Sequence, residues 1–163
     1  MLAALLVPAL AHTLTADLDR DGVPEHVEAG VDDQARIWVS VEEDGLVRRV
    51  ELDPFVDVNG PRDAFTLEVV SVEEAGVPML LVHVPAGPYC GSGNDWVYLS
   101  YTNGSLQPAL SLSDFADAPV WSTVEAQFDP AHKRVRVVKR WGREERPRGR
   151  EVRRLRFVDG IYE

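Results

Sequence analysis

The chain has 163 residues, of which 45% are hydrophobic and 27% are charged, so it is long enough and apolar enough for one domain with a substantial core. Its formal net charge of −10 argues against general binding to nucleic acid. A single cysteine, Cys90, excludes an internal disulfide. We expect one globular domain without a linker or a low-complexity segment.

Charge is distributed unevenly along the chain. Residues 131–156 contain twelve arginines and lysines against three glutamates, which gives this segment a charge of +9. The rest of the chain has five basic and twenty-four acidic residues, a charge of −19. The sequence therefore predicts a basic surface region on an otherwise acidic protein.

The first residues have the form of an export signal. Residues 2–10 are apolar but too few to span a bilayer, and Ala9, Leu10 and Ala11 form a small-x-small signal-peptidase site. The usual basic residues before such a run are missing, so either the start lies upstream or the signal is atypical; a first β-strand or a loose tail is the alternative. We expect a signal peptide over residues 1–11, no transmembrane segment, and a periplasmic or extracellular protein beginning at His12.

Alternating aspartates follow this signal, with a glycine and then a glutamate after them. Side chains at positions 1, 3 and 5 of such a turning segment converge on one point, and position 7 offers its carbonyl. The sequence predicts a structural calcium ion bound by Asp17, Asp19, Asp21, the Val23 carbonyl and Glu25. The alternative is an Asp/Gly turn without metal, in which the clustered carboxylates would repel one another.

The next segments alternate as strands do. Residues 35–41 and 46–52 flank an acidic turn and predict a hairpin. Residues 65–72 and 77–84 predict a second hairpin, whose second arm is apolar on both faces as in an internal strand. The glycine-rich residues 85–95 that follow predict an adaptable loop.

The remaining segments continue as hairpins. Residues 96–101 and 106–112 surround the tight-turn pair Asn103 and Gly104, and Pro108 indicates an edge or a bulge. Residues 113–119 predict a loop or a short helical turn. We expect roughly ten antiparallel strands in one all-β domain over residues 12–163, with a sandwich, barrel or propeller-like arrangement and no long helix.

The last part of the chain contains three more of the predicted strands. Residues 122–128 and 133–141 flank a turn at Asp129 and Pro130. A polar segment, residues 142–149, separates them from a strand at 151–158. Asp159 and Gly160 predict the last turn.

The acidic loop resembles that of FG-GAP and VCBS-type repeats, whose pattern D-x-D-x-D-G-x-x-[DE] lies between β-strands. Asp17, Asp19, Asp21, Val23 and Glu25 match it position by position. The later order of a glycine-rich loop, a hairpin and a closing strand resembles small exported bacterial β proteins, some of which act in the cell envelope as lysozyme inhibitors or immunity factors. This resemblance implies a non-enzymatic binding or inhibitory module.

An EF-hand is the competing interpretation of the same loop, because Glu28 occupies position 12. An EF-hand requires a helix on each side, whereas residues 12–16 are short and β-prone. Pro24 also occupies position 8, where paired EF-hands form a backbone bridge that proline cannot donate to. We therefore favour a loop between strands, with Glu25 as the last ligand.

Two regions are candidates for partner binding by a monomeric protein. Arginines alternate along two of the last strands. If these strands pair, they form a cationic face for an anionic glycan, a lipid head group or an acidic protein. Protection of a sheet edge is the alternative. The glycine-rich loop is the second region. The candidate partner-binding residues are Tyr89, Asn94, Asp95, Arg134, Arg136, Arg154 and Arg156.

Catalysis is not expected from this sequence. Cys90 and His83 would be the nucleophile and the base, but nothing in their spacing brings them within hydrogen-bond reach. The enzyme alternative is a secreted hydrolase stabilised by calcium. Finding Asp114 or Asp117 beside Asp95 or a histidine, within a cleft, would favour it.

Overall fold

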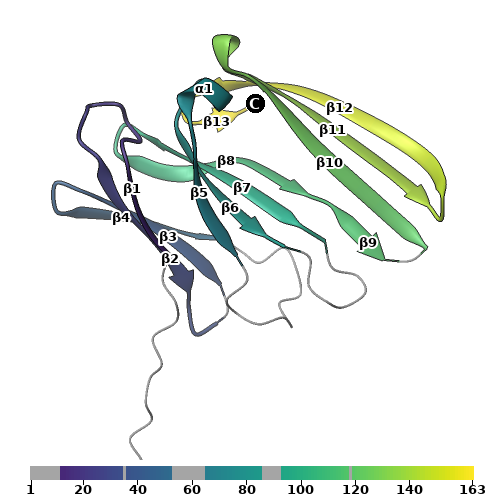
Figure 1. The fold of residues 1–163 in the computed structure, drawn as a ribbon, viewed down its shortest axis with the longest axis horizontal. Helices are drawn as coiled ribbons and strands as arrows, with labels where there is room; N and C mark the ends of the chain where they lie inside the picture. The colour runs from purple at the N-terminus through teal and green to yellow at the C-terminus, as the bar shows by residue number, and fades with distance from the viewer. Residues whose placement is uncertain (1–11, 35, 53–64, 86–92, 118) are drawn as a thin grey trace, which may run out of the picture.

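The computed structural model describes residues 12–34, 36–52, 65–85, 93–117 and 119–163. The predicted all-β, antiparallel fold without a long helix is confirmed: within these residues there are thirteen strands in three antiparallel sheets, and the helical pieces are only four and three residues long (Figure 1). The strands beyond the ten expected are short, or they border the acidic loop.

The first sheet has the order β1-β2-β3-β4 and consists of neighbours in the chain. Its strands are β1 (His12–Ala16), β2 (Glu25–Val31), β3 (Ile37–Glu43) and β4 (Leu46–Leu52). The predicted hairpin between β3 and β4 is present, because Asp44 and Gly45 have positive φ angles of 50° and 75°, as a type I′ turn requires. The acidic loop connects β1 to β2.

The second sheet has the order β5-β6-β7-β8 and lies in the middle of the molecule. It consists of β5 (Thr66–Val70), β6 (Met79–Val84), β7 (Asp95–Thr102) and β8 (Ser105–Ser113), with the one-turn helix α1 (Val72–Ala75) between β5 and β6. The predicted turn at Asn103 and Gly104 joins β7 to β8. The pairing register shifts between Tyr98 and Leu99 opposite Pro108, which confirms the predicted bulge.

The third sheet has the order β13-β12-β11-β10-β9. Its strands are β9 (Phe115–Asp117), β10 (Val120–Asp129), β11 (Arg134–Arg143), β12 (Arg146–Val158) and β13 (Ile161–Tyr162), with the 3-10 turn η1 (Pro130–His132) between β10 and β11. Two expectations were wrong here. Residues 115–117 form a strand rather than a loop. Most of the polar segment 142–149 belongs to β11 and β12, and only Glu144 and Glu145 form a turn between them.

The polar segment is strand because tryptophans occupy the space beside its glycines. Trp121 pairs with Gly142 across β10 and β11, and Trp141 pairs with Gly149 across β11 and β12. A Cβ atom built on Gly142 or Gly149 would meet the facing indole ring at 2.5 Å or 2.3 Å. Polar composition alone therefore does not identify a loop, because packing on a neighbouring strand decides the conformation.

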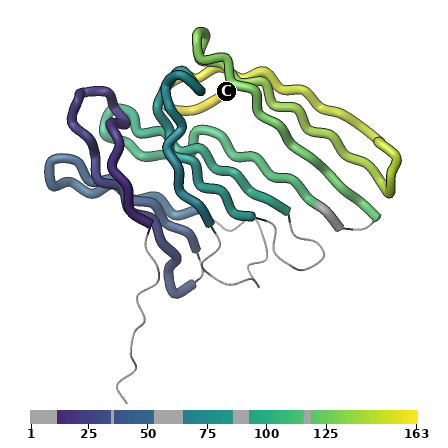
Figure 2. Tube along the Cα trace, viewed as in Figure 1, coloured from purple at the N-terminus to yellow at the C-terminus, as the bar shows by residue number. Residues whose placement is uncertain are grey.

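The second sheet separates two cores. Side chains alternate across it, so Leu80, Val82 and Leu99 pack against the first sheet, while Met79 and Tyr98 pack against the third. This double burial explains why residues 77–84 are apolar on both faces. Figure 2 shows the same order of layers along the chain, from the purple first sheet to the yellow β12.

Candidate functional site

The acidic loop lies between β1 and β2, and both flanks are strands rather than the helices of an EF-hand. Its backbone turns through positive φ angles at Arg20 (71°) and Gly22 (90°). Three of its amides donate to aspartates of the same loop: Asp21 N to Asp19 Oδ1 (3.0 Å), Gly22 N to Asp17 Oδ2 (3.2 Å) and Val23 N to Asp21 Oδ1 (2.7 Å). These bonds hold the carboxylates on the inner side of the turn.

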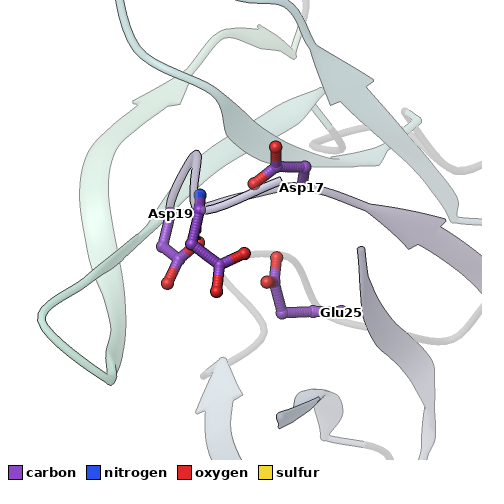
Figure 3. Close-up of side chains that lie close together, drawn as sticks. Asp17, Asp19 and Glu25 are labelled. Atoms are coloured by element: carbon purple, nitrogen blue, oxygen red, sulfur yellow. Dashed lines mark hydrogen bonds between the residues drawn. The ribbon is translucent and has the colours of Figure 1, made fainter. Parts of the chain in front are cut away.

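The four predicted carboxylate ligands come together. One oxygen from each of Asp17, Asp19, Asp21 and Glu25 lies within 4.8 Å of the others. Two oxygens on opposite sides of a calcium ion are about 4.6–5.2 Å apart, twice the usual Ca–O bond length. Figure 3 shows the labelled carboxylates of Asp17, Asp19 and Glu25 pointing into one small region. The arrangement therefore fits a hard divalent cation.

Glu25 differs from the three aspartates because it is only 3% exposed. Its carboxylate accepts a hydrogen bond from the Leu18 amide at 2.5 Å. Burial raises the pKa of Glu25, the nearby Asp19 and Asp17 raise it further, and the Leu18 amide opposes them. A buried carboxylate beside two others is costly to ionise without a positive charge, which is what a bound cation would supply.

A pocket of about 90 Å³ adjoins this cluster. It is lined on the loop side by Asp21, Val23 and Glu25. The end of β3 and the turn after it line it with Glu42, Glu43 and Asp44. Val23 thus lies beside the other predicted ligands and is 62% exposed. The sequence predicted this acidic turn only as part of a hairpin and not as a neighbour of the acidic loop, because the pairing of β2 with β3 is what brings the two together.

Glu28 does not join the cluster. It shares the face of β2 that carries His26, and its Oε1 lies 3.3 Å from His26 Nε2. Residues of a strand alternate between faces, so Glu25 and Glu28 project from opposite sides of β2. The twelfth position of the spacing is therefore directed away from the other carboxylates.

The predicted cationic face forms on the third sheet. Strand pairing places Arg134 opposite Arg156, Arg136 opposite Arg154, and Arg140 opposite Arg150. All six side chains therefore project from one face, with Val138 and Val152 between them. We call this set the arginine face. Like charges placed directly opposite one another destabilise a sheet by about 0.2–1 kcal/mol per pair.

Few of these arginines are neutralised within the described part of the chain. Arg140 forms an ion pair with Glu125 at 2.9 Å, and Arg136 donates to Gln127 Oε1 at 3.1 Å. The described carboxylates form no ion pair with Arg134, Arg150, Arg154 or Arg156, all of which are exposed. The positive charge is thus directed to solvent, mainly along β12.

A second acidic group lies where β7 begins. Asp95 is 4% exposed, and its Oδ2 has no hydrogen-bond partner among the described residues. Burial, and then the charge of Asp114, raise the pKa of Asp95 to about 6. Asp114 accepts from the Asn94 amide at 2.7 Å, and the Asn94 side chain lies 3.4 Å from His83 Nε2. Asp95 is therefore enclosed by the sheet rather than displayed at a loop tip.

Sequence reasoning anticipated only part of this acidic pair. Asp114 does lie near Asp95, as the hydrolase alternative required, but the neighbouring pocket of about 190 Å³ is lined by Ser111, Leu112 and Ser113 and includes neither carboxylate. His83 stacks on Trp96 of the next strand, with ring centroids 5.2 Å apart. The predicted signal residues 1–11, Tyr89 and Cys90 lie outside the described residues.

No helix in the described part of the chain has the length and apolar character needed to cross a membrane. Comparison of the chain with protein-family models, curated proteins and solved structures found no match.

Proposed function

We propose that this protein is a calcium-stabilised β protein of the cell envelope or the extracellular space, and that it acts by binding a partner rather than by catalysis. The observation that supports the calcium site is the convergence of four carboxylate oxygens within 4.8 Å in a loop between two strands. The buried Glu25 adds to this support, since bound calcium would offset the cost of ionising it.

Calcium would act here as a structural ion. Asp17, Asp19, Asp21 and Glu25 would supply carboxylate oxygens, and the Val23 carbonyl would complete the set. Binding would fix the connection between β1 and β2, whose strands supply Val27 and other residues of the first core. An ion at the entry to the first sheet therefore raises the stability of the whole fold.

The calcium site is tested by thermal unfolding after chelation. Calcium at about ten times its dissociation constant should stabilise the protein by about 1.4 kcal/mol, which corresponds to roughly 3–6 °C in a domain of this size. Magnesium should give a smaller shift, because it prefers a tighter octahedral site.

The double substitution Asp19→Asn with Asp21→Asn is expected to abolish the calcium shift. Asn keeps the size of Asp but removes the negative charge, so the loop fold is disturbed little while the site loses two of the four carboxylate charges that attract the cation. A matched control is Asp32→Asn with Asp33→Asn, because these aspartates lie outside the cluster. An undiminished shift in the loop variant would place the calcium elsewhere.

An envelope inhibitor of a lytic hydrolase is the sharper form of the binding role. It rests on the resemblance of the acidic loop and the later strand order to exported bacterial β proteins. In a turbidity assay of lysozyme on bacterial cell walls, the purified protein should slow clearing in proportion to its concentration. An unchanged rate would remove the lysozyme-inhibitor form and leave the calcium proposal intact.

A secreted hydrolase is the second candidate, and the pairing of Asp95 with Asp114 is the observation in its favour. A carboxyl group with a pKa of about 6 has the property of a general acid near neutral pH. Its 4% exposure opposes this role, since a substrate must reach the proton. Hydrolysis of a glycoside or ester substrate that disappears in Asp95→Asn would favour the enzyme.

A further inference from the structure

Strand β12 forms the outer border of the third sheet over most of its length (Figure 1). The two-residue strand β13 pairs only with Phe157 and Val158, and Glu163 continues this pairing to Arg156. Among the described residues, no strand pairs with the outer side of residues 146–155. A free edge of this length is a template for another strand.

The direction of the backbone groups at this edge follows from two hydrogen bonds. Arg156 N donates outward to Glu163 O at 2.7 Å, while Phe157 N donates inward to Lys133 O at 2.9 Å. Amides alternate in direction along an antiparallel strand. The N–H and C=O groups of Arg150, Val152 and Arg154 therefore point to the free side.

The side chains of these three residues all belong to the arginine face. Arg150, Val152 and Arg154 pair in register with Arg140, Val138 and Arg136 of β11. All three are exposed, and Val152 is 38% exposed. A strand added at this edge would meet a cation, an apolar side chain and a second cation, each about 7 Å from the next.

We infer that β12 is a docking edge for an extended acidic segment of a partner protein, which adds as a strand beside Arg150, Val152 and Arg154. In an antiparallel pair, residues directly opposite one another share a face. The segment that fits therefore has the pattern acid-x-apolar-x-acid, with its carboxylates opposite the two arginines. Main-chain hydrogen bonds would supply affinity, and the alternate side chains would supply specificity.

Charge disfavours a second copy of β12 as the occupant of this edge. Two β12 strands paired antiparallel about Val152 would place Arg150 of each opposite Arg154 of the other, which is a repulsive arrangement. An anionic polysaccharide would satisfy the arginines but would leave the outward amides and carbonyls without strand partners. The combination of free backbone groups with alternating cations therefore favours an acidic peptide strand.

The test uses the full chain and the blocked peptide Thr-Glu-Thr-Val-Thr-Glu-Thr, followed by ¹⁵N NMR and by fluorescence anisotropy of a labelled copy. Binding should shift the amide signals of Arg150, Val152 and Arg154. The matched peptide with Lys in place of Glu should bind at least tenfold more weakly. Equal binding of both peptides, or no binding of the Glu peptide, overturns the inference.

Charge reversal makes the test specific for this edge. Arg150→Glu with Arg154→Glu should exchange the preference, so that the Lys peptide binds more tightly than the Glu peptide. Arg153→Glu is the control, because Arg153 lies on the same strand but projects from the other face. An unchanged preference in the double variant, with its circular dichroism and calcium response intact, would place the site elsewhere.

Backbone methylation separates strand addition from simple charge attraction. Methylating the nitrogen of the central Val should abolish binding of the Glu peptide, whereas methylating an adjacent Thr should not. Equal binding of both methylated peptides, with displacement by heparin, would show a polyanion surface and overturn strand addition. This inference specifies the partner class for the proposed binding role, and its failure would leave the calcium shift unaffected.

Discussion

Asp95 illustrates how one residue acquires an unusual property from its place in the sheet. It pairs with Val84 on one side and with Ser113 on the other, so both neighbouring strands exclude water from its carboxylate. Gly93 allows this packing, because a Cβ at that position would meet the Asp114 carbonyl oxygen at 1.8 Å. The resulting burial, more than the charge of Asp114, raises the pKa of Asp95 to about 6.

The raised pKa predicts a pH-dependent cost in stability. The pKa of Asp95 in the folded protein lies above the ordinary aspartate pKa of 3.8, so protonated Asp95 stabilises the fold at low pH, and this contribution is lost as the pH rises through about 6. The free energy of unfolding of Asp95→Asn, taken relative to that of the parent, should therefore rise by on the order of 2 kcal/mol when the pH is raised from 4.5 to 8. Urea unfolding at the two pH values measures the difference.

A control for this comparison is Glu68→Gln, which also replaces a carboxylate by an amide but at an exposed position on β5. Its difference from the parent should stay nearly constant between the two pH values. If Asp95→Asn behaved in the same way, the Asp95 carboxyl would not be the group that is perturbed.

At the scale of the elements, pairing of tryptophan with glycine on the neighbouring strand recurs in this fold. Trp38 lies opposite Gly30, Trp121 opposite Gly142, and Trp141 opposite Gly149. Each glycine leaves room for the indole that faces it, since an added Cβ would meet ring carbon at 2.8 Å or less. These pairs keep strands rich in glycine and charge within the sheet.

Two of these glycines differ in what a side chain would meet, so substitution distinguishes their roles. At Gly142 an added Cβ would approach the Arg146 backbone oxygen at 2.5 Å as well as Trp121. At Gly149 the three nearest atoms all belong to the Trp141 side chain, and Trp141 is 38% exposed, so we expect its ring to shift aside. We expect Gly142→Ala to destabilise by about 1–3 kcal/mol and Gly149→Ala by less.

Chemical denaturation of the two alanine variants measures this contrast directly. Equal losses would mean that the indole rings, rather than the backbone of the β11–β12 turn, limit the space. A larger loss for Gly149→Ala would contradict the described packing.

At the scale of the whole molecule, the second sheet belongs to two cores at once. Leu80 and Leu99 pack toward the first sheet, whereas Met79 and Leu110 pack toward the third, and none of the four is more than 7% exposed. Side-chain hydrogen bonds also cross between sheets: Arg48 Nε donates to Gly104 O at 2.9 Å, and Ser100 Oγ to Gly160 O at 2.5 Å. Neither outer sheet can unfold without exposing one face of the second.

This sharing predicts a single cooperative transition for all three sheets. Variants that keep one tryptophan each, Trp38 in the first sheet or Trp141 in the third, would report on opposite sides of the molecule. In each variant, the urea midpoint from tryptophan fluorescence should equal the midpoint from circular dichroism of the same variant. Comparing the two signals within one variant removes the effect of stability differences between variants. Two separated midpoints would mean that the outer sheets unfold independently.

Local sequence was sufficient where one short pattern decides a local structure. Asp44-Gly45 and Asn103-Gly104 adopt the positive φ angles of tight turns, and Pro108 marks a bulge. The order of hairpins was likewise predictable, because consecutive antiparallel strands need only their own alternation and a turn. The alternation of the acidic residues also predicted that Asp17, Asp19, Asp21 and Glu25 would converge.

Tertiary structure decided everything that depends on contacts distant in the chain. Most of the polar residues 142–149 became strand because two tryptophans cover their glycines, and only Glu144 and Glu145 form a turn. Asp95 became a perturbed acid because strands on both sides bury it. The sequence by itself determined an all-β chain with an acidic loop and a basic C-terminal segment. Only strand pairing put the arginines in one row at a free edge, because register and sheet order depend on long-range packing rather than on local alternation.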